Sequence, residues 1–313
     1  MTEAPAPRTT AEFIFQGPYG LRAGWRLLLY ALLFVVLSGV LTVAVTVALA
    51  PMGWGHSMLA TTSATLFCAL VAGWVMVRVV DQRPVGALGF AAEPAGLKDS
   101  AVGTLAGGAM LGAAVVLLAV AGTARWVAEP GTVSEYVAAL GQALLFFWVA
   151  AALEEVLFRG YPFQVLVQGI GVWPTLLVTS ALFTYVHGHN PNVTALGLAN
   201  IFLAGFMLGV AYLRTRSLWF ATAVHMGWNW AMSGLLDFPV SGFRPFDAPY
   251  YDAHETGADW WTGGAFGPEA GVAATLTLAL GTVWLTRTRR IGESARMREL
   301  RPLVDARIGE GWR

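Results

Sequence analysis

The sequence predicts an all-α protein, a polytopic membrane bundle of about eight transmembrane helices with both termini in the cytoplasm. Of the 313 residues, 56% are hydrophobic and only 12% are charged, whereas a soluble domain carries about 25% charged residues. Apolar segments recur along the whole chain, and helices are the default for such segments because they satisfy their own backbone hydrogen bonds in lipid. Basic residues gather in alternate connections, as in multi-pass proteins.

Eight apolar segments approach the roughly 20 residues that a helix needs to cross the hydrocarbon layer. In chain order they are Leu27 to Ala50, Met58 to Val80, Ala101 to Thr123, Val133 to Phe158, Pro174 to His187, Leu196 to Leu213, Ser217 to Leu236 and Gly271 to Thr286. The first segment follows two arginines and ends in Ala48-Leu49-Ala50, which resembles a signal-peptide cleavage site. Its apolar run is longer than the core of a signal peptide, so we expect an uncleaved first span.

Charge sets the expected orientation. With the N-terminus inside, 17 of the 19 Lys and Arg residues fall on the cytoplasmic side, and only Arg125 and Arg244 fall outside. This asymmetry agrees with an even number of spans. The connection between the last two spans is acidic, which suits an outer face; its acids are Asp237, Asp247, Asp252, Glu255, Asp259 and Glu269.

The sequence predicts a single membrane domain. We expect a polar N-terminal tail over residues 1–22, a transmembrane domain over 23–286 with a motif-bearing core at 133–236, and a basic cytoplasmic tail over 287–313. Glycines four residues apart allow helices to approach closely, so we interpret them as packing positions. These pairs are Gly103 with Gly107, Gly108 with Gly112, and Gly205 with Gly209.

Composition also limits the partners. The formal net charge is zero, so no basic field is present to hold a nucleic acid. The single cysteine, Cys68, excludes an intramolecular disulfide. We expect the lipid bilayer as a partner, and the composition suggests a bacterial plasma membrane.

Ionisable residues inside apolar helices are costly and are therefore functional candidates. Two adjacent carboxylates, Glu154 and Glu155, end the fourth apolar segment, followed by Arg159. Residues four apart share a helix face, so Glu155 pairs with Arg159, whereas Glu154 points about 100° away. Glu154 is then a desolvated, unpaired carboxylate, the kind of group that serves as a general base on water.

Two further clusters lie on the next helices. Phe183 and His187 fall on one face of the fifth span, and His225 and Asn229 fall on one face of the seventh. Together the clusters supply a base, a proton carrier or ligand, and a donor pair that can hold an oxyanion. A lone membrane histidine usually serves packing, but three such clusters in one bundle favour a catalytic site.

The order EExxxR, FxxxH and HxxxN on successive apolar helices resembles the CPBP family, the CAAX proteases and bacteriocin-processing proteins also called ABI or Rce1-like. The matching residues are Glu154, Glu155, Arg159, Phe183, His187, His225 and Asn229. The resemblance implies an intramembrane endopeptidase, whose partner is a peptide or membrane-protein substrate. It also implies that Glu154 activates water with help from His187, that His225 and Asn229 stabilise the oxyanion, and that Glu155 and Arg159 orient the site.

The sequence is compatible with either a zinc site or a metal-free site. Glu154, His187 and His225 have the donor types of a zinc site with room for water. No HExxH motif is present, and the paired glutamates with Asn229 suit a metal-free mechanism. We favour no cofactor and keep zinc as the alternative.

Depth imposes a condition on the site. If the fourth helix ended at Phe158, Glu154 would lie near the inner surface while His187 lay about 20 Å further out. We therefore expect the helix to continue to about Gln168, with a kink near Pro162. We also expect the site to open toward the cytoplasmic side, because His225 lies early in its span.

Alternatives remain. A catalytically silent adaptor or immunity factor would keep the fold without the base, and a proton-coupled transporter would also place Glu and His in a bundle. The aromatic residues of the connection at 237–270 fit either an interfacial belt or a substrate lid. We take the endopeptidase as the main hypothesis.

Overall fold

The computed structural model describes residues 9–52 and 57–306, and most of them are helical. Each of the eight predicted apolar segments coincides with one long helix. These helices are α2 (Ala23–Leu49), α3 (Met58–Val75), α4 (Pro94–Val120), α5 (Val133–Arg159), α7 (Val172–His187), α8 (Ala195–Thr215), α9 (Leu218–Trp230) and α11 (Val272–Arg287). The predicted all-α class is confirmed.

The remaining elements are short. The helices are α1 (Thr10–Phe15), α6 (Tyr161–Ile170), α10 (Asp259–Thr262) and α12 (Ala295–Leu300). The strands are β1 (Gln16–Gly17), β2 (Gly20–Leu21), β3 (Ala124–Ala128) and β4 (Tyr251–Glu255), paired antiparallel as β1 with β2 and β3 with β4. Single helical turns of other types fill several connections, among them Met76–Val80, Ala231–Leu235 and Pro268–Ala270.

Membrane crossing is supported by length and composition. Five helical segments in the described ranges are long and apolar enough to span a bilayer: Ala23–Leu49, Met58–Val80, Pro94–Val120, Val133–Ile170 and Ala195–Thr215. Helix α11 is apolar but shorter. The chain is a multi-pass membrane protein, and the count of eight spans and the side of the termini stay predictions.

Side-chain caps explain where several helices begin. The Thr132 hydroxyl oxygen accepts a hydrogen bond from the Glu135 amide, and the Glu135 carboxylate accepts one from the Thr132 amide, so α5 begins with a complete capping box. Thr194 and Ser217 cap α8 and α9 through their side-chain oxygens. These caps fix the starts of two of the helices that carry motif residues.

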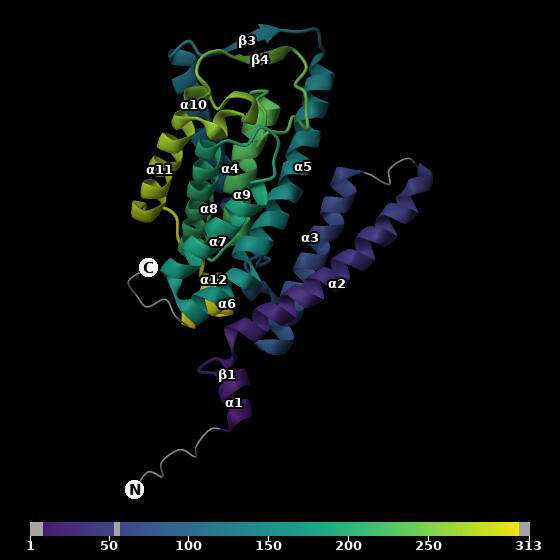
Figure 1. The fold of residues 1–313 in the computed structure, drawn as a ribbon, viewed down its shortest axis with the longest axis vertical. Coiled ribbons are helices and arrows are strands. Elements are labelled where there is room, and N and C mark those ends of the chain that lie inside the picture. The colour runs from purple at the N-terminus through teal and green to yellow at the C-terminus, as the bar shows by residue number, and fades with distance from the viewer. Residues whose placement is uncertain (1–8, 53–56, 307–313) are drawn as a thin grey trace.

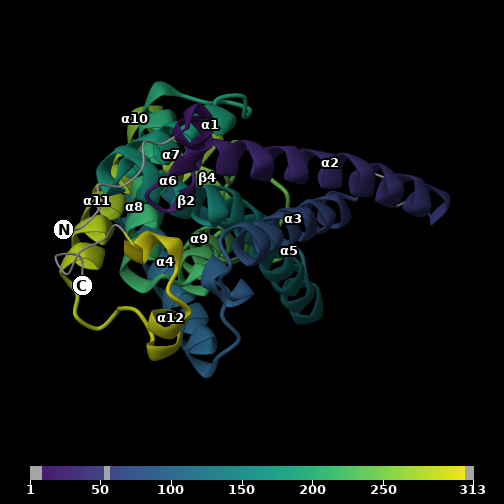
Figure 2. The ribbon, with the colours of Figure 1, turned by 90° about the horizontal axis from the view of Figure 1, so that it is seen from below.

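The helices form a bundle with one hairpin set apart. Figure 1 shows α4, α7, α8, α9 and α11 side by side, while the hairpin of α2 and α3 leans away from them toward one side. Viewed from below, this hairpin projects from the bundle (Figure 2). Only Arg26 and Tyr30 of α2 are buried; one side of this apolar helix packs on α3 and α6, and much of the remainder is exposed, as in a helix that faces lipid.

Helix α9 lies at the centre and is buried on nearly all sides. It contacts α4, α5 and α8. The contact with α4 is close because glycines line it: a Cβ on Gly107 would lie 2.0 Å from the Val224 carbonyl oxygen, and one on Gly227 would lie 2.3 Å from the Thr104 carbonyl oxygen. The predicted packing role of Gly103 and Gly107 is confirmed, since neither position has room for a Cβ, whereas that of Gly112 is wrong, because nothing lies within 4 Å of a Cβ there.

The continuation of the fourth span is also confirmed. Helix α6 extends the helical path from α5 to Ile170, past the predicted end at Gln168. The break falls at Gly160, two residues before the expected kink at Pro162. A Cβ at Gly160 would lie 2.2 Å from the Val156 carbonyl oxygen, which makes glycine the residue that fits this bend.

A cap covers the end of the bundle opposite the termini (Figure 1). It consists of β3, β4, α10 and the turns between residues 237 and 270. Asp237 anchors it: the buried carboxylate accepts hydrogen bonds from the amides of Ala248 and Ala253 and pairs with Arg244 at 3.2 Å. The sequence did not reveal this cap, because the pairing of β3 with β4 joins segments more than 120 residues apart.

The opposite end is held by buried polar contacts. Arg26 pairs with Asp81 and also donates to Gln168 of α6. Gln164 donates to the Ala87 and Leu88 carbonyl groups and accepts from the Leu303 amide, so the segment after α12 is fixed beneath the bundle. Part of the predicted basic tail is therefore packed on the protein; its last residues, 307–313, lie outside the described residues, as do residues 1–8 of the predicted N-terminal tail.

The close approach of α4 and α9 is testable with matched alanines. We expect Gly107→Ala to lower the free energy of unfolding by about 1–3 kcal/mol, because an extra carbon in a packed contact forces the backbones apart. Gly112→Ala is the control, since nothing lies within 4 Å of a Cβ there. It should be neutral or stabilising by up to about 1 kcal/mol through helix propensity. Denaturant unfolding in micelles compares the two, and equal effects would contradict the packing.

The stability of the folded protein should depend on pH through the Glu255 carboxyl group of the cap. Burial raises the pKa of this carboxyl from 4.5 to about 7. Between these values the folded protein keeps the proton that the unfolded chain has lost, so the stability from this group falls as pH rises through that window. Other acids titrate too, so we compare thermal midpoints of wild type and Glu255→Gln from pH 4.5 to 8. The thermal midpoint should fall less steeply with pH in Glu255→Gln than in wild type. In the control Glu129→Gln, at an exposed site, it should fall as it does in wild type.

Candidate functional site

A cavity of about 630 Å³ lies inside the bundle, between α5, α7, α8 and α9 and beneath the cap. Its wall is largely apolar, with phenylalanine and leucine side chains from α5 and α8. Five of the seven motif residues line it: Glu154, Phe183, His187, His225 and Asn229. The other two, Glu155 and Arg159, lie directly behind the wall and are fully buried.

The Glu155 carboxylate is the meeting point of two donors. Its Oε1 accepts from Arg159 Nη1 at 3.0 Å and from His225 Nδ1 at 2.9 Å. The predicted pairing of Glu155 with Arg159, one helical turn apart, is confirmed. Arg159 also donates to the Gly205 carbonyl at 2.7 Å and stacks over the Phe183 ring, with 4.8 Å to the centroid. These bonds tie α5 to α8 and α9 through one buried charge pair.

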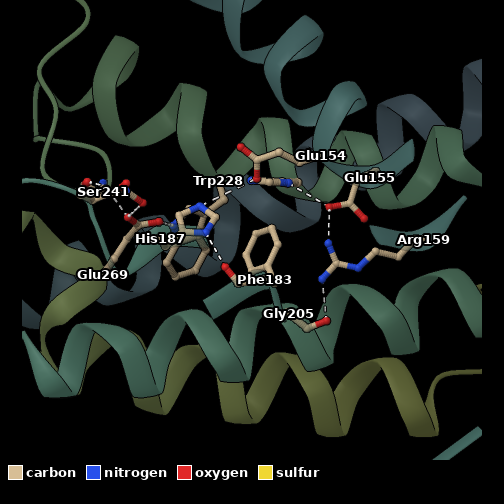
Figure 3. A network of polar contacts seen from close by, with 11 residues as sticks. Glu154, Glu155, Arg159, Phe183, His187, Gly205, Trp228, Ser241 and Glu269 are labelled. Carbon is tan, nitrogen blue, oxygen red and sulfur yellow. Dashed lines mark hydrogen bonds and ion pairs between the residues drawn. The ribbon is translucent and has the colours of Figure 1, made fainter. Parts of the chain in front are cut away.

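The side chain of Glu154 points in a different direction from that of Glu155. Its Oε2 lies 3.9 Å from His187 Nε2 and 3.8 Å from His225 Nε2, so the carboxylate faces both imidazoles (Figure 3). Both separations exceed a direct hydrogen bond. This Oε2 has no hydrogen-bond partner among the described residues, and 33% of the side chain is exposed. The structure thus brings together the three groups that the sequence placed on three helices.

Hydrogen bonds fix how each imidazole presents itself to the cavity. His187 Nδ1 lies 2.7 Å from the Phe183 carbonyl oxygen, which can only accept, so Nδ1 carries the proton and donates. His225 Nδ1 donates to the Glu155 carboxylate for the same reason. In both residues Nε2 is then the nitrogen that faces Glu154. Such a bond to Nδ1 sets the tautomer and the ring orientation.

Phe183 is the support of the cluster. Its ring centroid lies 4.5 Å from that of His187, 6.0 Å from that of His225 and 5.2 Å from that of Phe158. The ring therefore holds both imidazoles from one side. Asn229 lines the cavity one turn beyond His225, as its spacing predicted.

The cavity extends toward the cap, whereas the expectation was an opening toward the cytoplasmic side; which end of the bundle is cytoplasmic stays a prediction. Its lining includes Val240, Ser241, Phe243 and Arg244 of the cap, whereas no lining residue comes from α6 or α12. The other end is closed by the contact of Phe158 with Phe183 and by the bond from Arg159 to Gly205. The depth of His225 in its helix did not predict these long-range contacts.

Several polar residues of the cavity were missed from sequence. Glu269 is 8% exposed and accepts from Trp228 and Ser241. Burial raises the pKa of its carboxyl, and the bonds from Ser241 oppose that rise. Asn190 and Asn200 also line the cavity. The sequence signal for Glu269 was its place directly before an apolar helix, but the acidic connection made it look like a surface residue.

The zinc alternative was tested on the donor set. Glu154, His187 and His225 are of the right chemical types. Within residues 9–52 and 57–306, however, no group of three or more His, Cys, Asp or Glu side chains is arranged to hold a metal ion. The preference for a metal-free site therefore stays a prediction.

Comparison with known proteins locates the same core. Residues 136–231 match the family model described as type II CAAX prenyl endopeptidase Rce1-like. This segment contains all seven motif residues, and the match confirms the resemblance drawn from them. No curated protein matches the chain. The apolar helices indicate a multi-pass membrane protein, and its central segment is similar to a family of endopeptidases.

The buried ion pair should dominate local stability. We expect Glu155→Gln to lower the free energy of unfolding by about 3–5 kcal/mol, because it leaves Arg159 buried without its counter-charge. The control is Glu299→Gln, which removes an exposed pair with Arg296 and should change stability by less than about 1 kcal/mol. Thermal unfolding in nanodiscs measures both, and equal effects would contradict the structural role of the buried pair.

Proposed function

We propose that this chain is an intramembrane endopeptidase in which the Glu154 carboxylate activates a water molecule. The observation that carries the proposal is the position of Glu154 Oε2, 3.9 and 3.8 Å from the Nε2 atoms of His187 and His225 in one cavity. The family match supports a protease, and the mechanism is our own inference.

The chemistry begins with the water. Glu154 accepts a proton from it, and the resulting hydroxide oxygen bonds to the carbonyl carbon of the scissile peptide. His187 Nε2 has a free lone pair in the neutral ring, because Nδ1–H is engaged by Phe183. It can therefore hold the second hydrogen of that water. A base that is positioned in this way contributes typically 10²–10⁴-fold to the rate.

The attack places negative charge on the former carbonyl oxygen. His225 donates to this oxyanion from Nε2 only as an imidazolium, because its Nδ1–H is already given to Glu155. The neighbouring carboxylates Glu154 and Glu155 favour that cation. The Asn229 amide lines the same cavity and is the second donor. Pre-oriented donors of this kind are usually a large part of catalysis.

Collapse of the intermediate completes the reaction. The carbon–nitrogen bond breaks, and the leaving nitrogen takes up the proton held by Glu154. The second hydrogen of the water passes from the new carboxyl group through His187 Nε2 to the same nitrogen. The products are one peptide with a new carboxylate and one with a new ammonium group, and Glu154 and His187 return to their starting states. The pair of Glu155 and Arg159 takes no proton in this scheme and serves to orient His225.

The test is hydrolysis of internally quenched peptides by the full chain in lipid nanodiscs, with prenylated and unprenylated CAAX-type peptides as probes. We expect Glu154→Gln to reduce kcat/KM by at least about 10²-fold, since the variant keeps the shape and loses the base. Glu129→Gln, at an exposed connection, is the control and should leave the rate unchanged.

Two further arms separate the alternatives. If the side chains act without a metal, a chelator should not change the rate of hydrolysis. Complete loss of hydrolysis with the chelator, restored by added zinc, would replace the metal-free scheme. Glu154→Gln at the wild-type rate would contradict the proposal. Absence of hydrolysis by the wild type, together with a cellular phenotype that Glu154→Gln leaves intact, would favour the catalytically silent adaptor instead.

A further inference from the structure

A second set of polar residues crosses the cavity on the side of the cap. We call it the roof network, and it consists of Asn190, Ser241, Glu269 and Trp228. All four residues line the same cavity as Glu154. None belongs to the three motifs, and the mechanism above uses none of them. Figure 3 shows Ser241 and Glu269 on one side of His187, with Glu155 and Arg159 on the other.

Glu269 is the centre of this network. Its Oε1 accepts from Trp228 Nε1 at 3.1 Å, and its Oε2 accepts from the Ser241 amide at 2.8 Å and from Ser241 Oγ at 2.7 Å. The Ser241 carbonyl in turn accepts from Asn190 Nδ2 at 3.0 Å. The Glu269 backbone carbonyl accepts from Asn200 of α8 at 2.7 Å, which ties the segment before α11 to α8.

The chain of bonds joins the two segments that carry the imidazoles. Trp228 lies between His225 and Asn229 on α9, and Asn190 follows His187 by three residues at the end of α7. A rotation of α9 that moved Trp228 would move His225 and Asn229 with it. Through Ser241, Glu269 therefore fixes the separation between the α7 and α9 sides of the cavity.

The local backbone shows that this arrangement is held under constraint. Ser241 has φ of +49°, a left-handed conformation that is uncommon for residues other than glycine. Glu269 binds both its amide and its hydroxyl, and the next residue, Gly242, bonds through its amide to Phe266. A buried carboxylate is costly without such donors. Satisfied buried networks instead specify one geometry.

We infer that Glu269 is a positioning residue of the endopeptidase site, acting on His225 and Asn229 through Trp228 and on the His187 side through Ser241. The inference rests on the proposed function. A glutamine cannot replace the carboxylate, because its single acceptor oxygen can serve either Trp228 or Ser241, and its amide group would face a donor on the other side.

The first measurement is the split between kcat and KM with the quenched peptides in nanodiscs. We expect Glu269→Gln to lower kcat by about 10- to 100-fold, as the loss of precise alignment does, with KM changed by less than about threefold. The matched control is Glu255→Gln, a carboxylate of the same cap that does not line this cavity. It should keep kcat within about twofold of wild type.

A second variant removes the donor of the hydrogen bond from Trp228 to Glu269. Trp228→Phe keeps an aromatic ring and loses the indole N–H, so it should reproduce the fall in kcat. The double variant should be no slower than the slower single variant, because both changes break one interaction. Independent effects that multiply would overturn the inference, as would a wild-type kcat in either single variant.

The last readout needs no activity. In a ¹⁵N spectrum of the full chain, the Trp228 indole N–H signal is identified by its loss in Trp228→Phe. We expect it to move upfield in Glu269→Gln, since a charged acceptor is replaced; an unmoved signal overturns the network. If Glu154→Gln retained activity while the indole signal moved, the proposed function would fail and the roof network would stand. If Glu154→Gln were inactive and Glu269→Gln fully active, only the positioning role would fail.

Discussion

The site depends on one buried negative charge, that of Glu155. A carboxylate enclosed in an apolar bundle is stable only with close donors, and Glu155 receives them from Arg159 on its own helix and from His225 on α9. This double pairing fixes the imidazole of His225. It also determines what Glu154 does, because the adjacent residue on a helix points about 100° away. Glu154 is thereby turned into the cavity, where its Oε2 faces two imidazoles and has no direct hydrogen-bond partner among the described residues.

The surrounding fold serves to bring α9 into reach. Gly107 and Gly227 remove the side chains that would keep α4 and α9 apart, so α9 lies at the centre of the bundle. Phe183 of α7 then contacts both imidazoles. On the far side, Glu269 and Ser241 bind the cap to α9. Acidic residues thus hold the cavity from two ends, and the wall between them is largely apolar.

The sequence predicted the features that depend on local spacing. Apolar length gave all eight long helices, and the four-residue spacing gave the Glu155–Arg159 pair and the shared face of His225 and Asn229. The requirement that Glu154 and His187 lie at the same depth predicted that the helical path continues from α5 into α6. The features it missed depend on contacts between distant segments. The pairing of β3 with β4, the burial of Glu269 and the direction of the cavity all follow from a cap whose sequence has no helical or strand period.

The central claim is that one carboxylate and two imidazoles from three helices share a single cavity inside the membrane domain. The most direct measurement is an electron cryomicroscopy map of the full chain in a lipid nanodisc, at a resolution that places side chains. The account predicts a carboxylate oxygen of Glu154 within about 4 Å of Nε2 of both His187 and His225, as the ligand-free geometry here has it. A separation of Glu154 from both rings by about 10 Å, the diameter of a helix, or a Glu154 side chain directed at the acyl chains, would contradict it.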